Sequence, residues 1–278
     1  MQLNNLNIAV LGAGRSGRAA ARLAIKHGAR VCVFDASSSI DGWPEDIPLH
    51  TAATEEDGRA FHADMVVISP GIETDSPFVK SFGREGVETI GEMELACRFY
   101  HGRIIAITGT NGKTSTTYMI KSIAEEAGLK VGLIGTIHNL IGDRILETER
   151  TTPASVDLQK ILRDMKNAGV ELVVMEVSSH ALDQARVHGV EFDIGIFTNL
   201  TQDHLDYHKT FDNYLAAKKK LFLQSKRAVV NADDPHFASI TEGLDIPLTT
   251  FGIREKADFS ANDIEITTAG AQFAMRTP

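Results

Sequence analysis

Two short apolar runs, each followed at once by a glycine-containing turn and a helix-forming segment, constrain the fold of this chain most. The first run, at residues 8–11, enters Gly12-x-Gly14-x-x-Gly17. The second, at residues 104–107, enters Thr108-Gly-Thr-Asn-Gly-Lys-Thr114. A buried strand, a tight glycine turn and a helix open a βαβ unit, in which the strands pair in parallel. The sequence therefore predicts an α/β fold that contains two such units.

Length and composition favour two soluble domains. The chain has 278 residues, of which 43% are hydrophobic and 23% charged, as in ordinary globular proteins. No apolar run approaches the ~18 residues that a membrane helix needs, and the first residues lack a signal-peptide pattern. With Cys32 and Cys97 as its two cysteines, the chain can form neither a disulfide framework nor a four-thiolate zinc site. We expect a cytoplasmic protein without membrane attachment.

The formal net charge of −9 makes nucleic acid an improbable partner, because non-specific binding to nucleic acid depends on Lys and Arg contacts to phosphate. An acidic chain can still bind anionic ligands through helix N-termini, backbone N–H groups, single lysines and bound cations. The two glycine turns are the places where we expect such binding.

Hydrophobic patterning and turn residues predict the other elements. In the first part we expect a helix that Gly28 ends, strands at 31–34 and 65–68, and a helix that begins at Ser76-Pro77 with the serine as N-cap. In the second part the expected elements are helices ending near 127 and spanning 154–168 and 212–223, strands at 172–177, 193–197 and 228–230, and a strand-like alternation over 259–275. These elements predict a Rossmann-like domain at residues 1–100 and a P-loop-type domain with a mostly parallel sheet at residues 101–278.

The first glycine turn matches the dinucleotide-binding fingerprint. Gly12 and Gly14 would let the backbone approach a pyrophosphate, and Asp35 ends the next strand, where a ribose-binding acid would lie. The alternative is a tight turn between a strand and a helix in a Rossmann-like domain that binds no nicotinamide. Residues 8–35 leave both interpretations open.

The second turn indicates phosphate binding more strongly. Successive backbone N–H groups from Gly109 to Gly112 can surround an anion, Lys113 can reach terminal phosphates, and the Thr114 hydroxyl can ligate Mg²⁺. The turn departs from the common phosphate-binding loop because two residues, rather than four, separate its glycines. The alternative is a glycine-rich turn with an exposed lysine.

Two residues beyond this turn are candidate metal ligands. Glu176 ends an apolar strand, and a carboxylate at the carboxyl end of a parallel strand beside a phosphate loop suits Mg²⁺. Taken alone, such a glutamate is more often a solvated residue at the sheet edge. His204 follows the next strand and could bind a metal or serve only in hydrogen bonding.

Lys218 lies on the apolar face of a predicted helix. Spacings of three and four residues place it on one stripe with Tyr214, Ala217, Leu221 and Phe222. A lysine on a buried face tends to lose its charge, and a neutral amine can react with CO₂ to form a carbamate. The alternative is a lysine whose ammonium reaches the surface along the helix.

The segment from about 104 to 234 resembles the central ATPase domain of the Mur ligases, which are cytoplasmic, ADP-forming enzymes of peptidoglycan synthesis and hence of cell-wall growth, cell shape and cell division. The motifs that carry the resemblance are Thr108-Gly-Thr-Asn-Gly-Lys-Thr114, Thr151-Thr-Pro153, Glu176-Val-Ser-Ser-His180, Gln184-x-Arg186, Thr198-Asn-Leu-Thr-Gln-Asp-His-Leu-Asp-Tyr-His208, Ala216-Ala-Lys218 and Asn231-Ala-Asp-Asp234. Those between 151 and 208 are most similar to the type that adds the third residue, diaminopimelate or lysine, to UDP-MurNAc-L-Ala-D-Glu.

The resemblance implies roles for individual residues. ATP would be held by Gly109, Thr110, Asn111, Gly112, Lys113, Thr114 and Ser115. Mg²⁺ would be held by Thr114, Glu176, His204 and a carbamoylated Lys218, and the catalytic residues would be Lys113, Glu176, His204 and Lys218. The UDP-muramoyl dipeptide would contact Thr151, Thr152, Ser178, Gln184 and Arg186. Arg150 stands where that type usually has asparagine.

The first ~95 residues, with Gly12-x-Gly14-x-x-Gly17 and Ser69-Pro70-Gly71-Ile72, resemble instead the N-terminal domain of the D-glutamate-adding Mur ligase. That domain binds the UDP end of the substrate and no nicotinamide, so Gly12 and Gly14 would contact the UDP part and Asp35 would lie near the uracil. The family's third domain, which closes over ATP and recognises the incoming amino acid, is expected to be missing from the chain.

The resemblance implies ATP-dependent amide formation through an acyl phosphate, with UDP-muramoyl peptide, ATP and an amino acid as ligands. Three alternatives remain: addition of D-glutamate to UDP-MurNAc-L-Ala, a fragment that binds substrate and nucleotide without turnover, and an oxidoreductase domain fused to an NTPase. The oligomeric state is not predicted.

Overall fold

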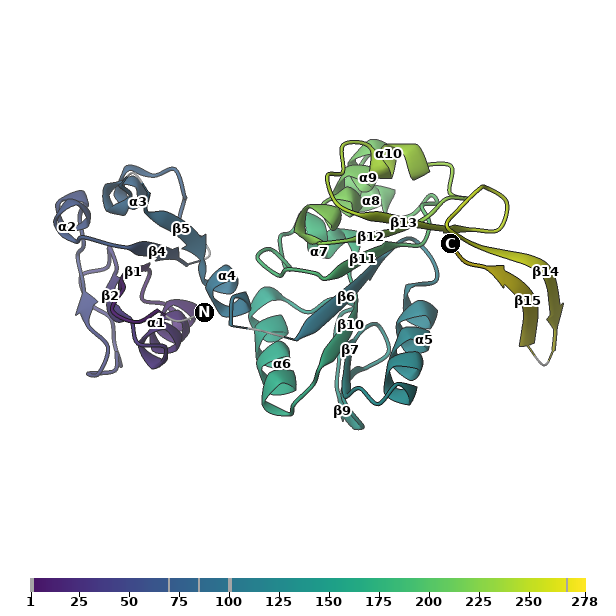
Figure 1. Ribbon diagram of the computed structural model, residues 1–278. Coiled ribbons are helices and arrows are strands. Elements are labelled where there is room, and N and C mark those ends of the chain that lie inside the picture. The colour runs from purple at the N-terminus through teal and green to yellow at the C-terminus, as the bar shows by residue number, and fades with distance from the viewer. Residues whose placement is uncertain (1–2, 70, 85, 100–101, 269) are drawn as a thin grey trace. The chain divides into compact units, whose positions relative to one another are not determined.

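The computed structural model describes residues 3–69, 71–84, 86–99, 102–268 and 270–278. The chain divides into two compact units, Met1–His101 and Gly102–Pro278 (Figure 1). Within the part of the chain that the structure describes, no helix combines the length and the apolar character that crossing a membrane requires.

The first unit is built on a five-stranded sheet in the order β3-β2-β1-β4-β5, and all its neighbouring strands pair in parallel. The strands are β1 (Asn7–Leu11), β2 (Arg30–Phe34), β3 (Leu49–His50), β4 (Met65–Ile68) and β5 (Glu88–Gly91). The helices are α1 (Arg15–Lys26), α2 (Glu55–Ala60), α3 (Pro77–Phe82) and α4 (Glu92–Cys97). The predicted strand, glycine turn, helix and strand at the start of the chain are therefore confirmed.

Both faces of this sheet are covered. Successive side chains of β1 point to opposite faces, so Ile8 and Val10 pack in one cluster, which includes the buried alanines of α1. Ala9 and Leu11 pack in the other, which includes Phe82 of α3. Helices on both faces of a parallel sheet define a doubly wound, Rossmann-like unit.

The predicted start of α3 is confirmed at the level of its cap. The Ser76 hydroxyl accepts a hydrogen bond from the backbone N–H of Val79 at 3.3 Å, and Pro77 occupies the first helical position. Proline has no N–H to leave unpaired there. Pro70, which was part of the predicted turn after β4, lies outside the described residues.

The second unit contains a ten-stranded sheet in the order β15-β14-β13-β12-β11-β6-β10-β7-β8-β9. The strands are β6 (Arg103–Thr108), β7 (Val131–Ile134), β8 (Asn139–Ile141), β9 (Arg144–Leu146), β10 (Leu172–Glu176), β11 (Ile194–Phe197), β12 (Ala228–Asn231), β13 (Leu248–Gly252), β14 (Phe259–Thr267) and β15 (Gly270–Arg276). In this spatial order, all neighbouring strands between β14 and β7 pair in parallel. Strand β15 at one end of the sheet, and β8 and β9 at the other, are joined by antiparallel pairing. The predicted mostly parallel sheet is confirmed.

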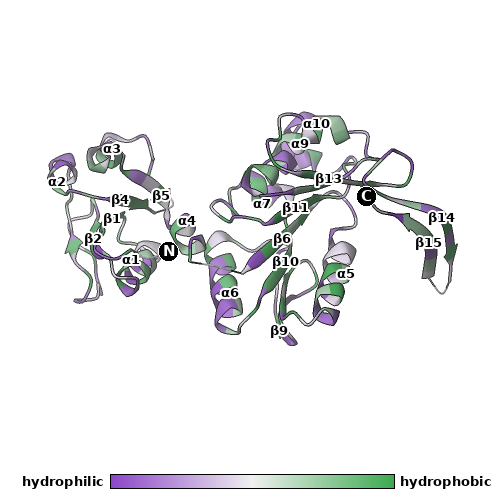
Figure 2. Ribbon diagram, in the orientation of Figure 1, coloured by the Kyte–Doolittle hydropathy of each residue, from purple (hydrophilic) through white to green (hydrophobic). Residues whose placement is uncertain are grey.

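The helices of the second unit are α5 (Lys113–Glu126), α6 (Ser155–Asn167), α7 (Ser179–Asp183), α8 (Leu205–His208), α9 (Phe211–Lys219), the 3₁₀ turn η1 (Phe222–Gln224) and α10 (Phe237–Thr241). Helices α5 and α6 lie on opposite faces of the sheet (Figure 1). Figure 2 shows hydrophobic residues along the central strands, and every residue of β10 is buried. These buried central strands support the loops at the edge of the sheet.

One predicted helix is shorter than expected. The segment predicted as a helix over 212–223 becomes α9, which ends at Lys219, and then the 3₁₀ turn η1. The Leu221 N–H donates to the Lys218 carbonyl, three residues earlier, at 3.1 Å. This tighter hydrogen bond replaces the α-helical one and ends the helix.

Candidate active site

The glycine loop and two of the predicted metal ligands, Thr114 and Glu176, meet at one edge of the second sheet. Strand β6 lies between β10 and β11, with Glu176 opposite Ile107 and Phe197 opposite Thr108. The carboxyl ends of the three strands are therefore level, and the loops that follow them gather at the same edge. In open parallel sheets this edge is where ligands bind.

Glycine is required at both ends of the loop between β6 and α5. Gly109 has a φ of +151°, and a Cβ there would overlap the Thr198 hydroxyl. Gly112, the N-cap residue of α5, has a φ of +85°. Residues other than glycine rarely adopt such backbone angles, so the two glycines determine the path of the loop.

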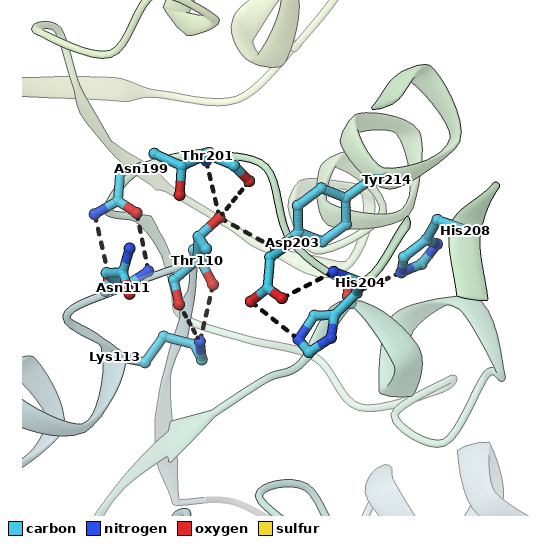
Figure 3. A network of polar contacts seen from close by, with 11 residues as sticks. Thr110, Asn111, Lys113, Asn199, Thr201, Asp203, His204, His208 and Tyr214 are labelled. Carbon is cyan, nitrogen blue, oxygen red and sulfur yellow. Dashed lines mark hydrogen bonds and ion pairs between the residues drawn. The ribbon is translucent and has the colours of Figure 1, made fainter. Parts of the chain in front are cut away.

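The loop after β11 holds the glycine loop through Asn199. Its amide accepts from the Asn111 N–H at 2.9 Å and donates to the Asn111 carbonyl at 3.1 Å, and its own carbonyl accepts from the Thr110 N–H at 2.9 Å (Figure 3). The N–H groups of Thr110 and Asn111 are therefore used within the protein, because the short loop packs directly against the β11 loop.

The start of α5 remains suited to an anion. It has no side-chain cap and no acidic residue in its first turn, so its N–H groups and its positive dipole end are not compensated locally. Thr114 and the exposed Ser115 belong to this first turn. Phosphate groups are common ligands of such helix ends.

Lys113 folds back over the loop. Its ammonium donates to the carbonyls of Gly109 at 2.9 Å and Thr110 at 3.0 Å (Figure 3). Burial lowers the pKa of Lys113, against the opposing effect of the nearby Glu176 and Asp203 carboxylates. A phosphate here would offer the ammonium stronger, charged acceptors than two carbonyls.

Glu176 is buried, with 1% of its surface exposed, and donors surround its carboxylate. Oε2 accepts from the Thr114 hydroxyl at 3.0 Å and from the Thr136 hydroxyl at 3.0 Å, and Oε1 accepts from the Thr136 N–H at 2.9 Å. A Cβ on Gly135 would lie 2.5 Å from Oε1, so the glycine leaves room for the carboxylate. The structure thus brings together two of the four predicted metal ligands, Thr114 and Glu176.

His204 adopts a left-handed conformation with a φ of +53°, which is uncommon for a residue other than glycine. The Asp203 carboxylate accepts from the His204 N–H at 2.8 Å and lies 3.4 Å from its ring Nε2 (Figure 3). The ring also lies 4.8 Å from that of His180, between centroids. No hydrogen bond or ion pair between described residues joins His204 to Glu176.

Lys218 is 1% exposed. The other four residues of its predicted stripe are also buried, with 0–1% of their surface exposed. Its Nζ lies 4.6 Å from the centre of the Tyr214 ring. Burial, together with the positive charge of Lys113, lowers the pKa of Lys218 to about 7, although Asp203 opposes the shift. The prediction of a buried lysine is confirmed, and the alternative, with the ammonium at the surface, is wrong.

The donor atoms near Glu176 fit a magnesium ion, which prefers oxygen ligands such as carboxylate and hydroxyl groups. Among the residues that the structure describes, no group of three or more His, Cys, Asp and Glu side chains could hold a metal ion. A cation beside Thr114 and Glu176 would therefore need further ligands of another kind, such as phosphate oxygens.

Two of the residues predicted to contact substrate use their hydroxyls within the protein. Thr152 is 1% exposed; its hydroxyl donates to the Glu176 carbonyl at 2.9 Å and accepts from the Ser178 N–H at 3.0 Å. The Ser178 hydroxyl accepts from the Ala181 N–H at 3.1 Å and caps α7. The buried Thr152 hydroxyl therefore joins the end of β10 to the loop that follows it.

The other three residues predicted to contact substrate lie close by. The Arg186 guanidinium donates to the Thr152 carbonyl at 3.2 Å and to the Gln184 side chain at 2.9 Å. Burial and the charge of Arg150 lower the pKa of Arg186. The Thr151 hydroxyl lies 3.1 Å from that of Thr136. Predicted substrate and metal residues of the second unit therefore share one edge of the sheet.

The glycine turn of the first unit needs only two of its three glycines for its own fold. Gly12 has a φ of +103°, and a Cβ on Gly17 would overlap the Gly12 carbonyl. A Cβ on Gly14, by contrast, would meet nothing within 4 Å. The Asp35 carboxylate accepts from the N–H groups of Ala13 at 2.7 Å and Ser37 at 2.8 Å. Burial raises the pKa of Asp35, but these hydrogen bonds outweigh burial and hold the pKa below its ordinary value.

Comparison with known families agrees with this geometry. Residues 107–278 match the family described as Mur ligase middle domain, and residues 6–91 match the family described as Mur ligase MurD-like, N-terminal domain. The chain belongs to the Mur ligase family. The resemblance on which the sequence analysis relied is thereby confirmed for both parts of the chain.

Curated relatives of this Mur ligase chain carry the name UDP-N-acetylmuramoyl-L-alanyl-D-glutamate–2,6-diaminopimelate ligase. One from Clostridium acetobutylicum is 52% identical over 193 residues, covering 69% of this chain and 40% of the relative. One from Clostridium tetani is 42% identical over 219 residues, covering 77% and 45%. The chain also matches a solved structure of a ligase with the same name. The match covers 98% of this chain and 50% of the chain in that structure, at 25% identity and a TM-score of 0.60. The chain thus spans about half the length of these relatives.

Several contacts that hold the Mur ligase site together were not predicted. Thr136 follows β7 and contacts Glu176. The hydroxyls of Thr110 and Tyr214 lie 3.1 Å apart, and Thr110 also accepts from the Thr201 N–H at 3.0 Å (Figure 3). The motif around residue 199 signalled the β11 loop as a whole, but no spacing in the sequence indicates which of its side chains would hold the glycine loop.

Proposed function

We propose that this Mur ligase chain forms the UDP-substrate-binding and ATP-binding parts of an ADP-forming amide ligase of peptidoglycan synthesis. The proposed reaction adds diaminopimelate or lysine to UDP-MurNAc-L-Ala-D-Glu. The observation that carries the proposal is the contact between the first turn of α5 and the end of β10, where the Thr114 hydroxyl donates to Glu176 at 3.0 Å. The names of the relatives support the choice of substrate.

ATP would bind along residues 109–115, with its phosphates at the N-terminus of α5. Thr114 and Glu176, together with His204, would hold Mg²⁺, which would supply charge neutralisation at the phosphates. Lys113 would leave the loop carbonyls and donate to the terminal phosphate. Such groups act by position and charge rather than by covalent chemistry, as is usual in phosphoryl transfer.

The proposed reaction has two steps. An oxygen of the D-glutamyl carboxylate attacks the γ-phosphorus of ATP, which releases ADP and leaves an acyl phosphate. The amine of the incoming amino acid then attacks the acyl carbon, phosphate leaves, and the amine loses a proton. Arg186, beside the Thr152 carbonyl at 3.2 Å, and Thr151 would hold the muramoyl peptide near the transferred group.

The environment of Lys218 supports a carbamate at this position. Because burial lowers its pKa to about 7, a large fraction of the amine is neutral at physiological pH and can attack CO₂. The product is a carbamate with the loss of one proton. It would place a negative charge near Lys113, whose charge acts on Lys218.

In the first unit, we propose that the glycine turn binds the UDP part of the substrate. The support is Gly14, whose missing side chain the fold of the unit does not require. Closely approaching phosphate oxygens would explain the glycine. The cytoplasm as location and the identity of the amino acid remain predictions.

Addition of D-glutamate to UDP-MurNAc-L-Ala is a second candidate, because residues 6–91 match the MurD-like N-terminal family. Calorimetric titration with UDP-MurNAc-L-Ala-D-Glu and with UDP-MurNAc-L-Ala, each with Mg²⁺ and a non-hydrolysable ATP analogue, separates the two. We expect tighter binding of the dipeptide. Tighter binding of the monopeptide would favour the second candidate, and binding of neither would contradict both.

A further inference from the structure

Thr136 connects two parts of the site that are distant in sequence. It follows β7 directly after Gly135, and β7 pairs with β10, which ends at Glu176. The Thr136 hydroxyl lies 3.0 Å from Oε2 of Glu176 and 3.1 Å from the hydroxyl of Thr151. One side chain therefore contacts both the proposed metal ligand and the segment proposed to bind the muramoyl peptide.

The Thr136 hydroxyl is the donor in both hydrogen bonds, to Oε2 of Glu176 and to the hydroxyl of Thr151. A hydroxyl carries one proton, so the two acceptors share it. The Thr151 hydroxyl accepts from Thr136 and keeps its own proton, which it can donate to an acceptor atom of a ligand.

We propose that Thr136 is a positioning residue that couples the segment around Thr151 to the carboxylate of Glu176. In this arrangement a ligand acceptor that takes the Thr151 proton makes Thr151 a stronger acceptor for the Thr136 hydroxyl, and so changes how Thr136 is shared between Thr151 and Glu176. The part of the inference that concerns Mg²⁺ rests on the proposed function. The contact of Thr136 with Thr151 and Glu176 does not rest on the proposed function.

Because of the position of Thr136, its hydroxyl can be removed to test the coupling without disturbing the fold. The residue is exposed and belongs to neither of the two buried clusters found among the described residues of the second unit. Replacing its hydroxyl by a methyl group should therefore leave the sheet intact. The backbone N–H of Thr136, which donates to Oε1 of Glu176 at 2.9 Å, is also kept in such a variant.

The first experiment needs no ligand. Hydrogen exchange over residues 147–154 is compared in the full chain, Thr136→Val, Thr136→Ser and Thr249→Val. Thr249 lies on β13, and no hydrogen bond of its hydroxyl is found among the described residues. Losing one hydrogen bond should make exchange about fivefold faster in Thr136→Val, with no change in the other two variants. Equal exchange in all four proteins would overturn the proposal.

The second experiment measures the effect of Mg²⁺ on the affinity for a non-hydrolysable ATP analogue in the same four proteins. Removing an outer partner of a metal ligand typically lowers metal affinity about 10-fold or more, so we expect such a loss in Thr136→Val and recovery in Thr136→Ser. If the unaltered chain binds no nucleotide with Mg²⁺, the proposed ATP site is wrong and the exchange data alone decide the coupling. If the unaltered chain binds and Thr136→Val binds equally well, the inference toward the metal is wrong and the proposed function stands.

Discussion

The phenol of Tyr214 and the hydroxyl of Thr110 lie 3.1 Å apart, so helix α9 contacts the glycine loop directly. The same helix carries Lys218, whose Nζ lies over the Tyr214 ring. Tyr214 is fully buried. Its ring contacts Lys218, whereas its hydroxyl contacts Thr110. The position of the loop therefore depends on a helix that begins about 100 residues later in the chain.

The first prediction concerns this contact. Tyr214→Phe keeps the ring but removes the hydrogen bond to Thr110. We expect a loss of about 1 kcal/mol in the free energy of unfolding and weaker binding of ATP analogues, measured by urea denaturation and calorimetry. Tyr118→Phe is the matched control, because no hydrogen bond of the Tyr118 hydroxyl is found among the described residues. Equal losses in both variants would show that the contact does not position the loop.

The second prediction concerns pH. The pKa of Lys218 falls from 10.5 to about 7 on folding, so between these values the unfolded chain binds one more proton than the folded chain. Stability should therefore rise with pH from about 7 to about 10, by up to about 1.4 kcal/mol per pH unit from this group. The measurement is urea denaturation in CO₂-free buffer. Lys218→Met should lose this contribution, and an unchanged pH dependence in the variant would contradict the assignment.

The third prediction concerns the carbamate. When the chain is kept in ¹³C-labelled bicarbonate at pH 8, we expect one carbamate carbonyl signal in the ¹³C NMR spectrum. Lys218→Met should lack the signal, whereas Lys219→Met should keep it, because Lys219 lies on the same helix but donates to the Ser239 carbonyl. A signal that persists in Lys218→Met would assign the carbamate to another amine.

The fourth prediction compares two glycines of the first unit. Gly17→Ala places a methyl group against the Gly12 carbonyl and should lower the free energy of unfolding by about 1–3 kcal/mol. Gly14→Ala meets no neighbouring atom and should cost at most about 1 kcal/mol as a poorer helix cap. Binding of UDP, measured by calorimetry, should nevertheless fall in Gly14→Ala. Retained UDP binding there would mean that the ligand does not approach this residue.

Local patterns were sufficient for much of the fold. Apolar runs and glycines placed β1, α1 and β6, and the three- and four-residue spacing placed Lys218 on the buried face of α9. These features depend on nearby residues only. The end of α9 was placed too late because a change from α to 3₁₀ hydrogen bonding leaves no mark in hydrophobic spacing.

The contacts within the site were less predictable, because most of them join distant segments. The hydrogen bond between Asn111 and Asn199 spans 88 residues, and that between Thr136 and Glu176 spans 40. Whether the Thr152 hydroxyl faces a ligand or the Glu176 carbonyl depends on how the strands align. Hydrophobic periodicity predicts the strands but not this alignment.

The 88-residue separation between Asn111 and Asn199 also bears on how the second unit acquires its structure. The glycine loop is made early in synthesis, yet its partner on β11 follows only after the intervening strands and helices. Closing so long a segment costs entropy before the contact can compensate, so the loop should become ordered late in folding. Nucleotide binding would then report complete folding of the unit, and by mass action it would protect the newly made chain from unfolding.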